Sequence, residues 1–142
     1  MHLDPSFADR AAGAFLGLAC GDAFGRTLEF ESGPKVRTQP VSTSAGSFCW
    51  TDDTHMALYL ADAVLAQPPG PLDDDRFGAS VGEAFVRWLD DPLTPSTAPG
   101  GTCLRGAGAF RAGRDWRASG VPESDGCGAV MRVVPVGIAF AG

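Results

Sequence analysis

The sequence predicts a helical protein, and three observations carry this prediction. Apolar residues recur at helical spacing in several separate runs, polar or acidic residues that favour helix starts precede them, and proline-rich or glycine-rich stretches lie between them. The clearest run extends from about Asp52 to Ala66, and Pro68 and Pro69 stop it. We expect the rest of the chain to be organised around this helix.

The composition is typical of a globular domain. Its 142 residues suit one domain of ordinary size, with 44% hydrophobic and 20% charged residues. The net charge of −6 argues against non-specific binding to nucleic acid or to an anionic membrane. Four cysteines without a C-x-x-C pair, and only two histidines, argue against a zinc site. No secretory signal is recognisable, so we expect a cytoplasmic protein with reduced thiols.

The chain begins with a predicted helix from Phe7 to Ala19, which we expect Cys20–Gly25 to end or bend. Asp22, within this stretch, is either an ordinary helix cap or a partner of the acidic cluster at residues 51–54. Glu29 follows between two large apolar residues, which is unusual for a solvated carboxylate, although an exposed glutamate is the simpler interpretation. Residues Ser32 to Ser47 predict a loop or an extended segment.

After the central helix, the sequence predicts two more helices. Asp73, Asp74 and Asp75 precede apolar residues at helical spacing, and we interpret these acids as helix-starting residues rather than as a second metal site. Pro92 to Gly101 predicts a loop, and Leu104 to Ala112 a short helix.

The central helix starts at an acidic cluster, Thr51-Asp52-Asp53-Thr54, which allows two interpretations. The first is a capped helix, in which Thr51 is the N-cap and the positive end of the helix dipole favours the acids. The second is a site for a hard cation, because carboxylates and a hydroxyl suit Mg²⁺, Ca²⁺ or Mn²⁺.

A glycine-rich stretch near the end of the chain also suggests ligand binding. Gly126 and Gly128 flank Cys127, and such a Gly-x-Gly allows close approach of backbone to a ligand. We expect a helix to start after it and to offer free N–H groups to a phosphate.

Three blocks, taken together, resemble the ADP-ribosylglycohydrolase family, of which the dinitrogenase-reductase-activating glycohydrolases are examples. They are Gly13–Gly25 with Glu29 after it, Trp50–Thr54 and Gly126–Pro135. The resemblance covers nearly the whole chain. It implies an all-α, orthogonal multi-helix fold, with residues 1–142 as the N-terminal portion of a single domain that is incomplete at its C-terminus.

The resemblance also implies a Mg²⁺-dependent hydrolase that cleaves the glycosidic bond of ADP-ribose attached to a protein side chain or small molecule. Two Mg²⁺ ions are implied, and Mn²⁺ is a possible substitute. The residues implied are Thr51, Asp52 and Asp53 as metal ligands, Glu29 and Asp53 as catalytic residues, Asp22 as a support behind the metals, and Gly126, Cys127, Gly128 and Met131 as substrate-binding residues.

Two departures from the family pattern qualify these expectations. Cys127 stands where many members carry Asn or Ser, which bears on substrate choice. The family's second metal block, Asp-x-Asp-Thr, does not occur in these 142 residues. We therefore expect one half of a two-metal site, completed by a C-terminal segment or a second polypeptide. The alternatives are an ADP-ribose-binding module without turnover and a purely structural relative.

Overall fold

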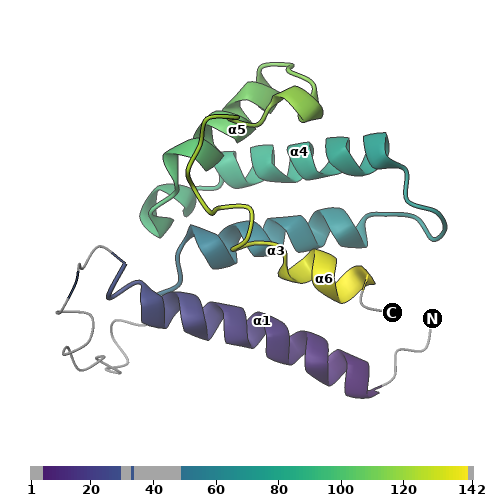
Figure 1. Ribbon diagram of the computed structural model, residues 1–142. Helices are drawn as coiled ribbons and strands as arrows, with labels where there is room; N and C mark the ends of the chain where they lie inside the picture. The colour runs from purple at the N-terminus through teal and green to yellow at the C-terminus, as the bar shows by residue number, and fades with distance from the viewer. Residues whose placement is uncertain (1–4, 30–32, 34–48, 141–142) are drawn as a thin grey trace. The chain divides into compact units, whose positions relative to one another are not determined.

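A computed structural model of the chain describes residues 5–29, 33 and 49–140. It divides into two compact units, Met1–Thr51 and Asp52–Gly142, and each is described by itself. Every regular element among the described residues is a helix, which confirms the predicted all-α fold. The elements are α1 (Pro5–Gly25), α3 (Asp52–Leu65), α4 (Asp74–Asp90), the 3-10 helix η1 (Thr94–Thr97), α5 (Gly101–Arg111), the 3-10 helix η2 (Trp116–Ala118) and α6 (Val134–Phe140) (Figure 1).

The first unit contains α1, which ends at Gly25, the last residue of the stretch Cys20–Gly25 that we expected to end or bend it. The helix therefore runs through most of this stretch before it ends. The N–H of Arg26 still donates to the carbonyl of Asp22 at 2.8 Å, as in a regular helix. A glycine inside a helix costs only about 1 kcal/mol relative to alanine, so its neighbours can outweigh it. The predicted loop from Ser32 to Ser47 lies outside the described residues, apart from Gly33.

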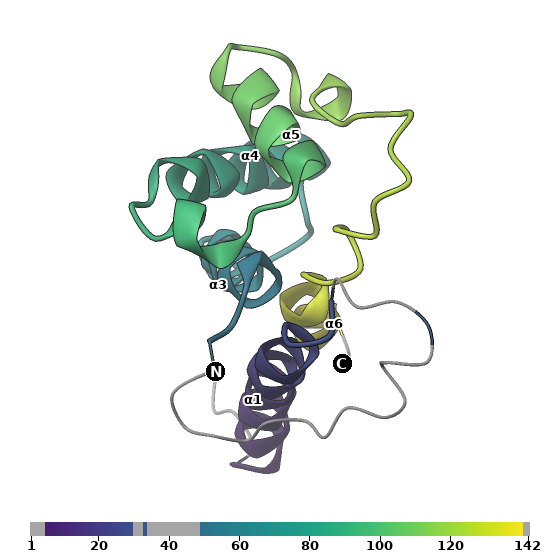
Figure 2. The same ribbon diagram turned by 90° about the vertical axis from the view of Figure 1, so that its left-hand side faces the viewer.

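The second unit packs its helices around α3 and α4. Figures 1 and 2 show α4 between α3 and α5, and α6 against α3. The helix α3 starts and ends within one residue of the predicted bounds. None of the described helices has both the length and the apolar character that crossing a membrane requires.

The predicted start of α4 is also confirmed. Asp73 lies just before the helix, and its carboxylate accepts a hydrogen bond from the N–H of Arg76 at 2.8 Å. Asp75 instead pairs with the Arg117 guanidinium and with the Trp116 indole N–H at 3.2 Å. These acids thus start a helix and hold η2 to it. The helix α5 begins three residues before the predicted Leu104.

The hydrophobic core of the second unit lies between α3, α4 and α5. Met56 and Trp88 are its largest fully buried side chains, and Ala107 joins them from α5. Partly buried side chains surround this centre: Tyr59, Phe85, Leu89, Cys103, Leu104 and Met131.

Two glycines of α4 allow aromatic side chains to approach its backbone. A Cβ atom at Gly78 would lie 2.4 Å from the Trp116 ring, and one at Gly82 would lie 2.5 Å from the Phe110 ring. These separations are far below van der Waals contact, so both positions require glycine in the present packing.

We predict that Gly82→Ala destabilises the protein by about 1–3 kcal/mol, because the new methyl group must displace the Phe110 ring. The matched control is Gly108→Ala in α5, where a Cβ atom would meet nothing within 4 Å. That control should stabilise the helix by about 0.5–1 kcal/mol. Urea denaturation measures both changes, and equal effects of the two substitutions would contradict this account of the packing.

Candidate functional site

The hydroxyl of the acidic cluster is held within the first unit. Thr51 is 4% exposed. Its backbone N–H donates to Oδ2 of Asp22 at 2.8 Å, and its hydroxyl donates to Oδ1 at 2.7 Å. A hydroxyl that donates its proton in this way keeps the acceptor character that a metal ligand needs. Asp22 therefore orients Thr51, whereas its predicted role behind bound metals stays a prediction.

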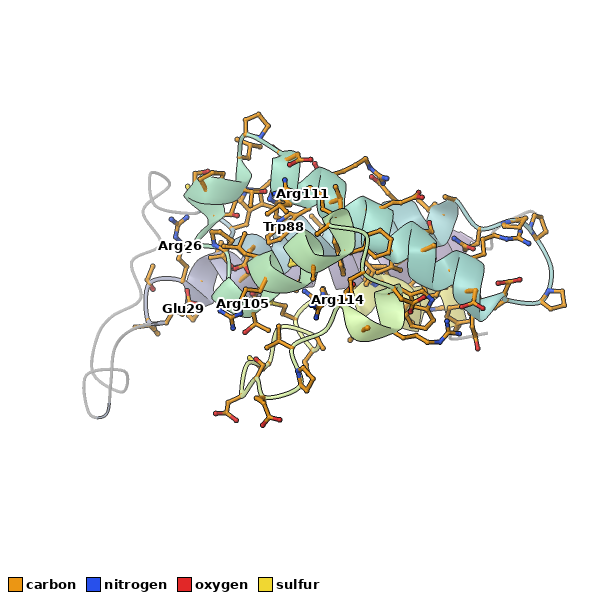
Figure 3. All side chains as sticks on the ribbon, turned by 90° about the horizontal axis from the view of Figure 1, so that it is seen from above. Arg26, Glu29, Trp88, Arg105, Arg111 and Arg114 are labelled. Carbon is orange, nitrogen blue, oxygen red and sulfur yellow. The ribbon has the colours of Figure 1, made fainter. Side chains whose placement is uncertain are left out.

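Glu29 lies on the turn that follows α1, and its side chain is exposed (Figure 3). Its exposure agrees with the simpler interpretation of an ordinary solvated carboxylate, and it also leaves the carboxylate open to a substrate. Glu29 belongs to the first unit and Asp53 to the second. Their implied roles as catalytic residues stay predictions.

The two carboxylates of the cluster form the first turn of α3. Asp52 is buried, at 7% exposure, and Asp53 is half-buried. The backbone N–H of Gly100, just before α5, donates to Oδ2 of Asp52 at 3.0 Å. The N–H groups and the dipole at a helix start favour negative charge there. The structure thus supports the interpretation as a helix start, and a cation site stays a prediction.

The donor atoms of this cluster nevertheless fit a hard cation. In the part of the chain that the structure describes, no three His, Cys, Asp or Glu side chains are grouped to hold a metal ion. Thr51, Asp52 and Asp53 supply one hydroxyl and two carboxylates, which are the oxygen donors that Mg²⁺ and Mn²⁺ prefer. Further positions around such an ion would be filled by water, substrate or other ligands.

A polar cluster joins α3 to the residue that follows α4. Oδ2 of Asp91 accepts a hydrogen bond from the Tyr59 hydroxyl at 2.7 Å and lies 3.2 Å from Nε2 of His55. The N–H of Leu93 donates to Oδ1 at 2.8 Å. The rings of His55 and Tyr59 meet edge to face, with centroids 5.3 Å apart.

Sequence analysis missed this cluster. The four-residue spacing of His55 and Tyr59, which places both on one helix face, was the available signal. Nothing in the sequence marks Asp91 as the partner of a histidine 36 residues away.

The pKa values of the cluster reflect its hydrogen bonds. Burial, followed by the Asp91 carboxylate, raises the pKa of Tyr59 to about 12. The hydrogen bond from Tyr59, followed by the one from the Leu93 N–H, lowers the pKa of Asp91. The stabilisation from Asp91 is therefore present above the ordinary carboxyl pKa and is lost as pH falls through the lowered value. That from Tyr59 is present below its ordinary pKa of 10.0 and is lost as pH rises towards about 12.

The glycine-rich loop packs on the first turns of α5. The hydroxyl of Ser124 accepts a hydrogen bond from the Gly126 N–H at 3.1 Å and lies 3.0 Å from the Thr102 hydroxyl. A Cβ atom at Gly128 would lie 3.0 Å from Sγ of Cys103, so packing itself favours glycine there. Gly128 therefore has a structural role, whatever part it takes in binding.

The other two predicted substrate-binding residues lie in different surroundings. Cys127 is exposed, whereas Met131 packs against the core of the second unit. The helix expected after the Gly-x-Gly is present, but it does not follow directly. Turns occupy residues 128–132, and α6 begins only at Val134. Pro135 favours this later start, because proline suits the first turn of a helix, where its missing N–H is not needed.

Arg132 connects the loop to three helices, a role that sequence analysis also missed. Its Nη1 atom lies 3.1 Å from Sδ of Met56 in α3 and 3.3 Å from Sγ of Cys103 in α5. Its guanidinium carbon lies 4.8 Å from the centroid of the Phe85 ring in α4. These contacts hold the loop against the core.

Comparison with known proteins gives consistent matches. The model of a family described as ADP-ribosylglycohydrolase matches residues 3–142. The ADP-ribosylarginine hydrolase Tri1 of Pseudomonas putida (strain GB-1) is 38% identical over 141 residues, which cover 92% of this chain and 36% of that protein. The ADP-ribosyl-[dinitrogen reductase] glycohydrolase of Rhodospirillum rubrum is 35% identical over 147 residues, which cover 97% and 47%. The chain thus spans less than half the length of these relatives. No solved structure matches it.

We predict that Tyr59 titrates near pH 12 and that Asp91→Asn lowers its pKa, because the substitution removes the negative charge beside the phenol. Tyr59 is the chain's one tyrosine, so ultraviolet absorbance at the phenolate band reports it alone. Asp90→Asn, at the exposed neighbouring position, should leave the titration unchanged. A tyrosine that titrates near pH 10 in the folded wild-type protein would contradict the described cluster.

Proposed function

This chain belongs to the ADP-ribosylglycohydrolase family, and we propose that it forms part of a Mg²⁺-dependent hydrolase of ADP-ribose linkages. The names of its relatives specify ADP-ribosylated arginine and ADP-ribosylated dinitrogen reductase, which supports an ADP-ribosylated protein as the substrate class. The cytoplasm is the proposed location, because Cys20, Cys49, Cys103 and Cys127 are all free thiols.

The observation that carries this proposal is the run Thr51-Asp52-Asp53. Its hydroxyl donates to Asp22, its first carboxylate is buried and accepts the Gly100 N–H, and all three side chains offer oxygen donors. We assign these three residues as Mg²⁺ ligands, with Mn²⁺ as a substitute. In a complete two-metal site, such ions supply Lewis-acid character and lower the pKa of bound water. The remaining protein ligands would come from a C-terminal segment or from a second polypeptide.

Two carboxylates, Glu29 and Asp53, are proposed to act in the hydrolysis itself. Hydrolysis of a glycosidic bond passes through an oxocarbenium-like state and needs groups that move protons at the water and at the leaving group. Glu29 is exposed on a turn, where a substrate can reach it. We assign to Glu29 the proton transfer near the scissile bond and to Asp53 the orientation of the attacking water.

The glycine-rich loop is the proposed substrate-binding element. Gly126 and the exposed Cys127 would contact the ribose and phosphate groups directly. Gly128 and Met131 contribute by packing, since they hold the loop on Cys103 and on the core.

The metal assignment predicts that Asp52→Asn and Asp53→Asn abolish the Mg²⁺-dependent stabilisation of the protein by ADP-ribose. A ligand present at 100 times its Kd stabilises a folded protein by about 2.7 kcal/mol, which a thermal melt detects. The control is Asp74→Asn, an exposed carboxylate that also lies in the first turn of a helix. If Asp74→Asn abolished the stabilisation while Asp52→Asn and Asp53→Asn retained it, the metal ligands would be at the start of α4 and the assignment would be wrong.

A second prediction separates a hydrolase from a binding module. If Glu29 acts on protons, Glu29→Gln should lower turnover of an ADP-ribosylated arginine substrate by about 100-fold or more while ADP-ribose affinity changes little. The assay uses this chain together with the C-terminal part that carries the second acidic block, because both halves of the site are needed. ADP-ribose binding without any turnover in the wild type would support the binding module instead.

A further inference from the structure

The segment from Asp91 to Gly100, here called the brace, connects α4 to α5 and contacts α3 at both of its ends. At its start, Asp91 accepts a hydrogen bond from Tyr59 and lies 3.2 Å from His55. At its end, the Gly100 N–H donates to Asp52 at 3.0 Å. These three residues of α3 lie at positions i, i+3 and i+7, which places them on one face of the helix. The brace therefore runs along the face that carries Asp52.

Hydrogen bonds within the brace, and one to the last turn of α4, hold the brace in one conformation. The N–H of Thr94 donates to the carbonyl of Asp91 at 3.0 Å, and its hydroxyl donates to the carbonyl of Trp88. The hydroxyl of Thr97 donates to the carbonyl of Thr94 at 2.9 Å, and both threonines are buried. Ala98 has a φ of 55°, a left-handed conformation that is uncommon for a residue with a side chain. Such a conformation persists where the surroundings impose it.

The Asp91 carboxylate is not needed to end α4. The cap at that helix end uses the backbone N–H of Asp91, which donates to the carbonyl of Trp88 at 3.2 Å. Its carboxylate instead receives one hydrogen bond from within the brace and contacts two side chains of α3. Buried polar clusters of this kind add little net stability compared with well-packed apolar residues. In this protein, the contacts of Asp91 join the start of the brace to one face of α3.

We propose that Asp91 is a positioning residue for the Asp52 carboxylate. By fixing the start of the brace on His55 and Tyr59, Asp91 sets where the brace ends, and so places the Gly100 N–H against Asp52. Groups that hydrogen-bond to a metal ligand orient it, and their loss typically weakens metal binding about 10- to 100-fold. The inference rests on the proposed role of Asp52 as a Mg²⁺ ligand.

The test uses nuclear magnetic resonance of the full chain and has two readouts. The first is the hydrogen-exchange rate of the Gly100 amide without any metal, which reports the hydrogen bond to Asp52. The second is cation binding, followed by Mg²⁺ titration and by the broadening that paramagnetic Mn²⁺ causes in amides near its site. Thermal melts followed by circular dichroism verify that each variant is folded.

Asp91→Asn should accelerate exchange of the Gly100 amide and weaken Mg²⁺ and Mn²⁺ binding, each by about tenfold or more. Tyr59→Phe removes one hydrogen bond to Asp91 and should move both readouts in the same direction by a smaller factor. It also keeps the test decisive should Asp91→Asn fail to fold. Asp90→Asn is the matched control, because this neighbouring carboxylate is exposed and pairs only with Arg111, at 2.8 Å, among the described residues. It should change neither readout.

Two results would overturn the inference. One is an unchanged Gly100 exchange rate in both folded variants, which would show that the ends of the brace are not coupled. The other is faster exchange with unchanged cation affinity, which would show that the hydrogen bond does not position Asp52 for a metal. A wild-type protein that binds neither cation would overturn the proposed function itself. The exchange rates would then still decide whether Asp91 places Gly100.

Discussion

The second unit depends on how the first turn of α3 is held, because this turn is both polar and buried. Asp52, Thr54 and His55 are each buried, at 7% exposure or less, although they are polar or ionisable residues at a helix end. Burial of such groups is unfavourable unless they are hydrogen-bonded. The Gly100 N–H donates a hydrogen bond to Asp52, and the Asp91 carboxylate contacts His55. Residues distant in the sequence must therefore pack against this turn.

The same helix also supplies the centre of the hydrophobic core. Met56 follows the polar turn directly and is 1% exposed, next to Trp88 of α4 and Ala107 of α5. One helix therefore carries two of the proposed metal ligands, Asp52 and Asp53, and a main core contact, only a few residues apart. A change that shifts α3 to relieve strain in the core would also move the carboxylates, so stability and site geometry are coupled through this element.

Helix boundaries, which depend on neighbouring residues, can be predicted from the sequence, whereas contacts between residues far apart in the chain cannot. The start and end of α3 and the start of α4 follow from acids, hydroxyls and prolines within a few residues of each boundary. The end of α1 falls within the stretch Cys20–Gly25 predicted to end it, at its last residue, because glycine inside a helix carries only a modest penalty that its neighbours outweigh. The contacts of Asp91 and Arg132 join residues separated by tens of positions, and no local pattern encodes them. The predicted site residues are likewise local motifs, and their arrangement around a substrate stays a prediction.

The glycine-rich loop shows why a motif should not be assigned wholly to chemistry. Gly128 lies so close to Cys103 that a Cβ atom there would make a tight contact with its Sγ, and Arg132 ties the loop to α3, α4 and α5. Both residues therefore have packing reasons to be present, whether or not a ligand is bound. Cys127, in contrast, is exposed and touches none of these anchors in the described contacts. Since its neighbours hold the loop in place, Cys127 is the position where a substitution would leave the fold intact while changing the proposed substrate contacts.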